Sequence, residues 1–222
     1  MRFGNLIIFT GMDGSGKTTA AEFLVNYLRG RGCSTKLVWI KSSHTLAYLL
    51  TQFFSRFQYE RTIYNPNKVK IRQFKSSDIG SFRKIWPLIE FASVVPLIIL
   101  KVYLPMLFGF TIVADRYLID TVISIATRVE QPCFIEGFFS KCLLEMIPSY
   151  SVLIHLECSY GVLIKRRVDI EFTDSELRQQ IRFYALLSRE LGATTIDTTN
   201  NFQENRALIL KTVGLKDQRG NL

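Results

Sequence analysis

The amino-acid sequence predicts an α/β domain built on a doubly wound parallel sheet, and two observations lead to this class. Three short apolar runs, at residues 5–9, 110–114 and 152–157, are typical of strands buried on both faces, as a helix-covered parallel sheet requires. Segments with helical periodicity and the length of crossover connections lie between them, which gives an alternating β-α order. Two shorter runs, at residues 36–40 and 194–197, are further candidate strands.

The chain is expected to form one domain over residues 1–222, because no repeat, linker or low-complexity tract divides it. Its net charge of +9 favours anionic partners such as nucleotides, nucleic acid or an acidic membrane surface. The four cysteines include no C-x-x-C pair, so we expect neither a zinc site nor a disulfide framework. The N-terminal apolar stretch is too short for a secretory signal. These features predict a cytoplasmic protein.

One apolar run, residues 94–113, has the length of a membrane span. Lys101 lies inside it, and Pro96 and Pro105 interrupt it. Its last part, "FTIVADR", is typical of a buried strand that ends in charged residues. We therefore predict a helix-turn-strand unit and no membrane association.

Two helices are well marked. The first is predicted over residues 17–29, where apolar residues follow a helical stripe. The second begins at a capping-box pattern formed by Thr173 and Glu176 and ends at Gly192. The aromatic and basic region of residues 43–87 has weak periodicity, and it is either a substrate-recognition insert or an ordinary helical cover.

The stretch "GMDGSGKTT" follows the first predicted strand and fits the phosphate-binding pattern G-x-x-x-x-G-K-[ST]. Glycines let the backbone amides converge on one point at a helix N-terminus, where Lys17 adds a full positive charge. Lys17 is expected to reach the β- and γ-phosphates of a nucleoside triphosphate, and the Thr18 hydroxyl to bind Mg²⁺. We call residues 11–19 the phosphate loop, and its predicted ATP-binding residues are Gly11, Met12, Asp13, Gly14, Ser15, Gly16, Lys17, Thr18 and Thr19.

The stretch "FTIVADRY" supplies a second group of charges. Asp115 ends a predicted buried strand, where its carboxylate can hold Mg²⁺. Arg116 follows at the carboxyl end of the sheet, where it can bridge the donated phosphoryl group and the accepting oxygen. The alternative is that Asp115 and Arg116 merely pair at a strand end.

The stretch "LIKRRVD" supplies a third group. Lys165, Arg166 and Arg167 end a predicted helix that begins near Ser159, and a polar acidic segment follows. The cations either close over a transferring phosphate as part of a short lid at about residues 160–173, or form an ordinary basic helix C-terminus. The local sequence leaves both alternatives open.

Together, "GMDGSGKTT", "DRY", "KRR" and the final "TTIDTT" followed by "NNFQENRALIL" resemble the thymidylate kinases in order and spacing over nearly the whole chain. The resemblance implies a five-stranded parallel sheet in a homodimer that transfers the γ-phosphoryl group of ATP to dTMP with Mg²⁺. It also implies that the apolar stretch of residues 88–107 lies partly in the subunit interface.

The resemblance further implies particular roles for residues. Asp13 would face the sugar of the acceptor, Asp115 would serve Mg²⁺, and Arg116 would bridge the transferring phosphoryl group. Arg166 or Arg167 would be the lid arginine, in keeping with Ser15 at a loop position where some relatives carry an arginine. The predicted catalytic residues are Lys17, Arg116, Arg166 and Arg167, and the predicted substrate contacts are Asp13, Phe91, Arg116 and Tyr117.

The acceptor side departs from the family pattern. After the second strand the chain reads "IKSSHTLAY", where thymidylate kinases have an "REPGGT"-like loop. Phe91 matches the family phenylalanine that holds the base, but Val95 replaces the arginine four residues later. Arg72 or Arg83 is a candidate substitute for that arginine.

These observations lead to an ATP- and Mg²⁺-dependent kinase of a nucleoside monophosphate, with dTMP as the first candidate acceptor. Two alternatives stay open: a kinase of a nucleoside or another small molecule, and a non-catalytic nucleotide-binding relative. We expect a homodimer with a small-molecule acceptor and do not expect nucleic acid as a partner. His44 and His155 are expected to be structural.

Overall fold

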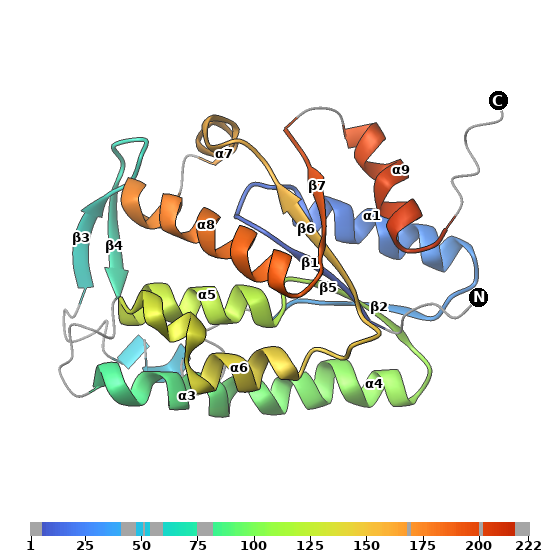
Figure 1. The fold of residues 1–222 in the computed structure, drawn as a ribbon, viewed down its shortest axis with the longest axis horizontal. Helices are drawn as coiled ribbons and strands as arrows, with labels where there is room; N and C mark the ends of the chain where they lie inside the picture. Colours follow the sequence, from blue (N-terminus) through green and yellow to red (C-terminus); the bar gives the residue numbers. More distant parts are fainter. Residues whose placement is uncertain are drawn as a thin grey trace.

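The computed structural model describes residues 6–40, 48–50, 52–53, 60–74, 82–167, 170–199 and 202–215. Five parallel strands form the central sheet in the order β2-β5-β1-β6-β7 (Figure 1). Their bounds are β1 Leu6–Thr10, β2 Thr35–Val38, β5 Thr111–Asp115, β6 Val152–Glu157 and β7 Thr194–Asp197. This arrangement confirms the predicted five-stranded parallel sheet, with strand ends that differ from the expected ones by one or two residues.

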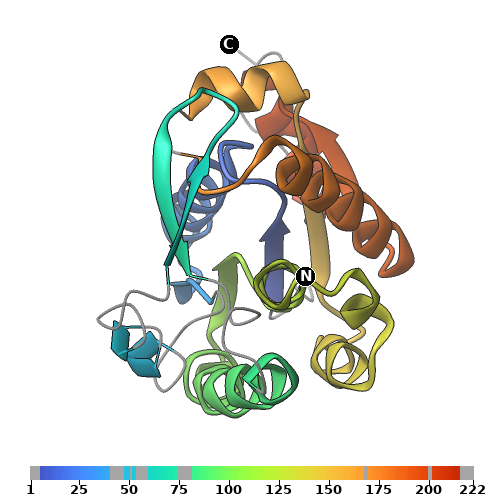
Figure 2. The same cartoon turned by 90° about the vertical axis from the view of Figure 1, so that its left-hand side faces the viewer.

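Helices cover both faces of the sheet. The two helices α1 and α9 pack on one face, and α3, α5 and α8 lie on the other (Figures 1 and 2). The side chains of β1 alternate between the two cores, so Leu6 and Ile8 join one cluster while Ile7 and Phe9 join the other. The helix bounds are α1 Lys17–Gly30, α3 Phe82–Ile98, α4 Leu104–Leu107, α5 Leu118–Val129, α6 Phe138–Glu145, α7 Tyr160–Arg166, α8 Asp174–Glu190 and α9 Phe202–Thr212.

The strand register brings the functional segments to one edge. Phe9 pairs with Asp115, Thr10 with His155, and Glu157 with Asp197, so the four strands β5, β1, β6 and β7 end together. In parallel sheets, ligands bind in the crevice outside the carboxyl ends of the strands. The phosphate loop, the "DRY" stretch and the lid all begin at this edge.

The long apolar segment splits into a helix and a strand, as the sequence predicts. Helix α3 continues through a five-residue π-helix, Ile99–Tyr103, into α4, and β5 follows. Pro105 has no N–H to donate to the preceding turn, which favours an irregular helix at this point. In the part of the chain that the structure describes, the stretch Lys84–Leu107 is long and apolar enough to cross a membrane. Core helices of soluble proteins can be equally long and apolar, and 39% of the 18-residue apolar window within this stretch is buried.

A two-stranded antiparallel sheet projects from the region that the sequence left open. Strands β3 Glu60–Tyr64 and β4 Lys70–Phe74 form a hairpin, so the helical-cover alternative is wrong for this segment. The stretch Asn65-Pro66-Asn67-Lys68 forms the turn, with Pro66 at a position that suits its fixed φ and Lys68 in the left-handed region at φ 60°. The Asn-Pro pair is a turn signal that could have predicted this hairpin.

Candidate active site

The phosphate loop joins β1 to α1 in the conformation that its glycines require. Gly11, Gly14 and Gly16 have φ of 140°, 91° and 90°, which L side chains rarely adopt. A Cβ atom on Gly11 would overlap the backbone carbonyl oxygen of Leu156 in the neighbouring strand. Only glycine therefore lets the chain turn this close to β6 and begin a helix with free backbone amides.

Lys17 is buried beneath this loop. Its ammonium group donates to the carbonyl oxygens of Gly11 and Met12, both at 2.7 Å, and lies 3.7 Å from the Asp13 carboxylate. Burial lowers the pKa of Lys17, and the carboxylates of Asp13 and Asp120 counter part of that effect. The loop thus holds a cation at its centre, next to the amides that begin α1.

Asp115 and Thr18, the two predicted Mg²⁺ ligands, lie in direct contact. The Thr18 hydroxyl donates to Asp115 Oδ2 at 2.6 Å, and Asp115 Oδ1 is buried with no hydrogen-bond partner among the described residues. No cluster of three or more His, Cys, Asp or Glu side chains gathers in the described ranges. Mg²⁺ needs none, because it binds one or two carboxylates together with substrate phosphates. The chemistry of this pair therefore fits Mg²⁺.

Arg116 is held in a strained backbone conformation at the end of β5. Its φ is 77°, and its N–H donates to the carbonyl oxygen of Phe9 at 3.1 Å. The guanidinium forms an ion pair with Asp13. Burial acts to lower the pKa of Arg116, but the carboxylates of Asp13 and Asp120 outweigh it and raise that pKa. Left-handed backbone at a non-glycine residue costs about 1–3 kcal/mol and persists only where the surrounding structure holds it.

The lid arginines reach the same loop from α7. Arg166 donates to the carbonyl oxygens of Gly14 at 3.3 Å and Thr198 at 2.8 Å. Arg167 forms an ion pair with Asp13 at 3.4 Å. The Asp13 carboxylate therefore lies among three cations that come from the phosphate loop, the "DRY" stretch and the lid.

These groups surround a cleft of about 420 Å³. Phosphate-loop residues 14–19, the two arginines at the end of α7, and Thr198 in the segment after β7 all line it. Thr198 fixes that segment by donating to the carbonyl oxygens of Ser15 and Glu157, at 2.9 and 3.0 Å. The lining residues are Gly14, Ser15, Gly16, Lys17, Thr18, Thr19, Ala20, Arg116, Leu156, Arg166, Arg167, Thr198, Asn205 and Ile209. All four predicted catalytic residues are among them.

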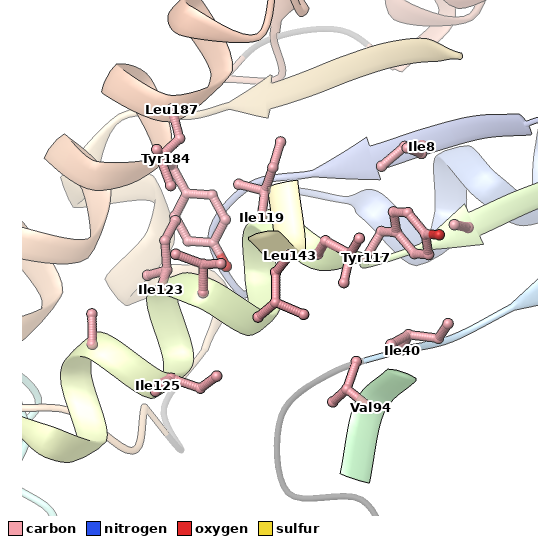
Figure 3. Close-up of a cluster of buried hydrophobic side chains, with 14 of the residues drawn as sticks. Ile8, Ile40, Val94, Tyr117, Ile119, Ile123, Ile125, Leu143, Tyr184 and Leu187 are labelled. Carbon is pink, nitrogen blue, oxygen red and sulfur yellow. The ribbon is translucent and has the colours of Figure 1, made fainter. Parts of the chain in front are cut away.

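Of the four predicted substrate contacts, Asp13 and Arg116 pair at the phosphate loop, whereas Phe91 and Tyr117 do not line the cleft. Tyr117 is fully buried in the core beside Ile8 (Figure 3), and its hydroxyl has no hydrogen-bond partner within the described chain. Phe91 packs against Phe139 of α6, with ring centroids 6.0 Å apart. Both rings thus make packing contacts within the protein, and neither lines the cleft, so their expected substrate contacts stay predictions.

The candidate substitutes for the acceptor arginine are also dispersed. Val95 is half-buried on α3, and Arg72 lies exposed on β4 of the hairpin. The side chain of Arg83 lies outside the described residues, as does His44. None of the described cations on α3 lines the cleft.

A buried carboxylate below the cleft was not assigned a role from the sequence. Asp120 accepts hydrogen bonds from the hydroxyls of Thr10 and Tyr184, at 3.0 and 2.9 Å, and from the backbone N–H of Tyr117 at 3.3 Å. Burial raises its pKa, whereas Lys17 and the other nearby donors act in the opposite direction. Asp120 thereby links β1, α5 and α8 beneath Lys17. Asp120 accepts the N-cap N–H as the third residue of a capping box would, but Tyr117 is not a capping-box residue type, so no sequence pattern marked it.

His155 gives the fold a testable pH dependence. Burial and the nearby Lys17 lower its pKa from 6.5 to about 4. The unfolded chain therefore takes up a proton below pH 6.5 that the folded chain binds only near pH 4, so acid removes stability in this window. We expect the His155 contribution to reduce the free energy of unfolding by about 2 kcal/mol between pH 7 and pH 5.

Urea unfolding of the wild type and His155→Gln at both pH values measures this effect. The variant is expected to lose about 2 kcal/mol less than the wild type over the same interval. Equal pH dependence in the two proteins would show that His155 titrates normally in the fold.

The comparisons with known proteins support the fold. No protein-family model matches the chain, and no match is found among curated proteins. The crystal structure of thymidylate kinase from Ehrlichia chaffeensis superposes with a TM-score of 0.59 at 16% sequence identity. The match covers 95% of this chain and 98% of that one. The chain therefore shares the fold of this thymidylate kinase over nearly its whole length.

Proposed function

We propose that this protein is an ATP- and Mg²⁺-dependent kinase that phosphorylates a nucleoside monophosphate, with dTMP as the first candidate. One observation carries the proposal: Lys17, Arg116 and the lid arginines come from three distant segments and line one cleft at the edge of a P-loop kinase fold. A protein that only holds a nucleotide has no evident need for cations on all sides of it.

The residues have separate roles in in-line phosphoryl transfer. The loop amides and Lys17 bind the β- and γ-phosphates of ATP, and Arg116 orients the donated group toward the acceptor. Arg166 or Arg167 neutralises charge that develops during transfer. Mg²⁺ held near Thr18 and Asp115 supplies further charge neutralisation when bound. Catalysis then rests on positioning and electrostatics, without a covalent intermediate.

Asp13 is the proposed contact to the acceptor. In the structure its carboxylate pairs with Arg116 and Arg167 and lies near Lys17. ATP phosphates offer these cations a stronger anionic partner, which frees Asp13 to accept a hydrogen bond from a sugar hydroxyl. This exchange couples binding of the donor to readiness for the acceptor.

The acceptor class is tested with ATP, Mg²⁺ and a panel of nucleoside monophosphates and nucleosides. We expect ADP formation with at least one monophosphate, dTMP first. A nucleoside acceptor is the second candidate, because an uncharged acceptor needs no arginine and valines occupy that part of α3. Calorimetry that finds tighter binding of thymidine than of dTMP would favour it. Hydrolysis of ATP to ADP without phosphorylation of any compound in the panel would count against both the monophosphate and the nucleoside proposals.

We also propose a homodimer in the cytoplasm. Exposed apolar side chains run along one side of the long helix formed by α3, the π-helix and α4, at steps of three or four residues: Ile85, Leu88, Ala92, Pro96, Leu100, Leu104 and Leu107. A continuous apolar stripe of this kind is the surface that a two-fold dimer buries.

The dimer is tested by sedimentation at micromolar concentration. We expect the wild type to sediment as a dimer and the variant with Leu100→Glu and Leu104→Glu as a monomer, because two charges would be buried without partners. Lys101→Glu, which replaces one charged side chain by another on the same helix, is the control. It should dissociate the dimer less than the double variant does. A wild type that sediments only as a monomer would contradict the proposal.

A further inference from the structure

The turn of the β3–β4 hairpin is bonded to the lid. Asn67 donates from Nδ2 to the carbonyl oxygens of Ile164, at 3.3 Å, and Arg167, at 3.0 Å. Asn65 donates from Nδ2 to the carbonyl oxygen of Ile170 at 3.2 Å. Figure 2 shows the hairpin turn against α7, although about 100 residues separate them along the chain. Three lid carbonyls, spaced three residues apart, are thus held from one turn.

The turn itself is built to keep these two amides in place. Asn65 is 4% exposed, and its side-chain oxygen accepts the backbone N–H of Val69 at 2.8 Å. The backbone N–H of Lys68 closes the turn onto the Asn65 carbonyl oxygen at 2.9 Å. Pro66 restricts the chain between the two asparagines. The turn therefore fixes the two side-chain amides by contacts of its own, independently of the lid.

The bonded carbonyls are those that a helix end leaves without partners. Helix α7 ends at Arg166, so the last carbonyl groups have no N–H donor within the helix. Asn67 supplies a donor to the carbonyl of Ile164, in the last turn, and to that of Arg167, which directly follows the helix. Arg167 is the C-cap residue of the same helix, and its guanidinium extends to Asp13 in the phosphate loop. A donor on the hairpin thus anchors the backbone that carries a cleft-lining arginine.

We infer that Asn67 is a positioning residue, which docks the lid on the hairpin and so holds Arg167 over the phosphate loop. The docking itself stands on the hydrogen bonds, whereas its effect on phosphoryl transfer rests on the proposed function. Asn67 does not line the cleft, so its action on a bound nucleotide passes through Arg167. The hairpin then supports the active site, although the phosphate-loop motif does not predict it.

The test replaces the amide donor and follows the lid directly. Asn67→Asp keeps the size and the turn preference of asparagine but removes both donated hydrogens. Asn67→Ala removes the side chain without adding charge. Thr62→Ala, at an exposed position of the same hairpin, is the matched control. The readouts are tryptic cleavage after Arg166 and Arg167 in the folded protein, and amide hydrogen exchange in α7 and α5.

We expect both Asn67 variants to speed lid cleavage and exchange in α7 about tenfold, because the lid loses two hydrogen bonds. Exchange in α5 and both rates in Thr62→Ala should stay within twofold of wild type. If the two Asn67 variants cleave no faster than the control, the docking is refuted. If exchange in α5 rises as much as in α7, Asn67 supports the whole fold and the positioning role is refuted.

Kinetics give the second readout. With an accepted substrate, kcat of the Asn67 variants should fall about tenfold while KM for ATP stays within twofold, because the lid arginine acts on the transferring group. An unchanged kcat with a faster-opening lid would refute the positioning role. If no substrate is accepted, the kinase proposal fails by itself, and cleavage and exchange still decide the docking.

Discussion

Replacing both lid arginines, Arg166→Ala with Arg167→Ala, is expected to lower kcat by roughly 10³- to 10⁵-fold. The reason is electrostatic: charge develops on the transferring phosphoryl group, and a guanidinium that closes over it in a water-poor cleft stabilises the transition state. In the structure Arg166 bonds to Gly14 and Arg167 pairs with Asp13, so both lie against the phosphate loop.

Steady-state kinetics with the accepted substrate measure this loss. Lys165→Ala is the matched control, since Lys165 is an exposed cation on the same helix turn that does not line the cleft. Its kcat should stay within twofold of wild type. A double arginine variant that keeps a tenth of the wild-type kcat would show that the basic end of α7 is an ordinary helix terminus.

The second large effect is expected on stability, at Gly11→Ala. The added methyl group overlaps the Leu156 carbonyl oxygen, and φ of 140° is open only to glycine. Backbone strain and overpacking together should lower the free energy of unfolding by about 4 kcal/mol. ATP binding should be lost in the fraction that stays folded, because the loop must move away from β6.

Gly32→Ala is the control for backbone strain alone. Gly32 also has a positive φ, of 77°, but a Cβ atom there meets nothing within 4 Å and lies far from the phosphate loop. Its cost should be about 1–2 kcal/mol, with ATP binding unchanged. If urea unfolding shows the same loss in the free energy of unfolding for both variants, the close approach to Leu156 contributes nothing to the effect of Gly11→Ala.

The donor side of the site could be predicted from the sequence because its chemistry depends on local backbone geometry. The glycine spacing, Lys17 and Thr18 together define a loop that works only between a strand and a helix. Asp115 could be placed because it ends an apolar run, and the structure brings it to 2.6 Å from Thr18. The capping box at Thr173 likewise depends on residues three positions apart.

The surroundings of the predicted acceptor residues could not be predicted, because they depend on tertiary packing. Tyr117 follows Arg116 directly, yet its ring turns into the core while the arginine turns to the cleft. Phe91 lies on a helix whose apolar residues face both the core and α6, and the sequence does not show which contact it makes. Asn67 acts on a segment about 100 residues away, a distance that no local pattern encodes.

Transfer of label from ATP marked at the γ-phosphorus is the decisive experiment on phosphoryl transfer by this protein. Wild-type protein with Mg²⁺ and dTMP, or with another monophosphate from the panel, should move the label onto a nucleoside diphosphate. Lys17→Met should bind nucleotide weakly and transfer no measurable label, because the loop loses the cation at its centre. The account would be contradicted if folded wild-type protein transferred no label to any acceptor, or if Lys17→Met transferred it as fast as wild type.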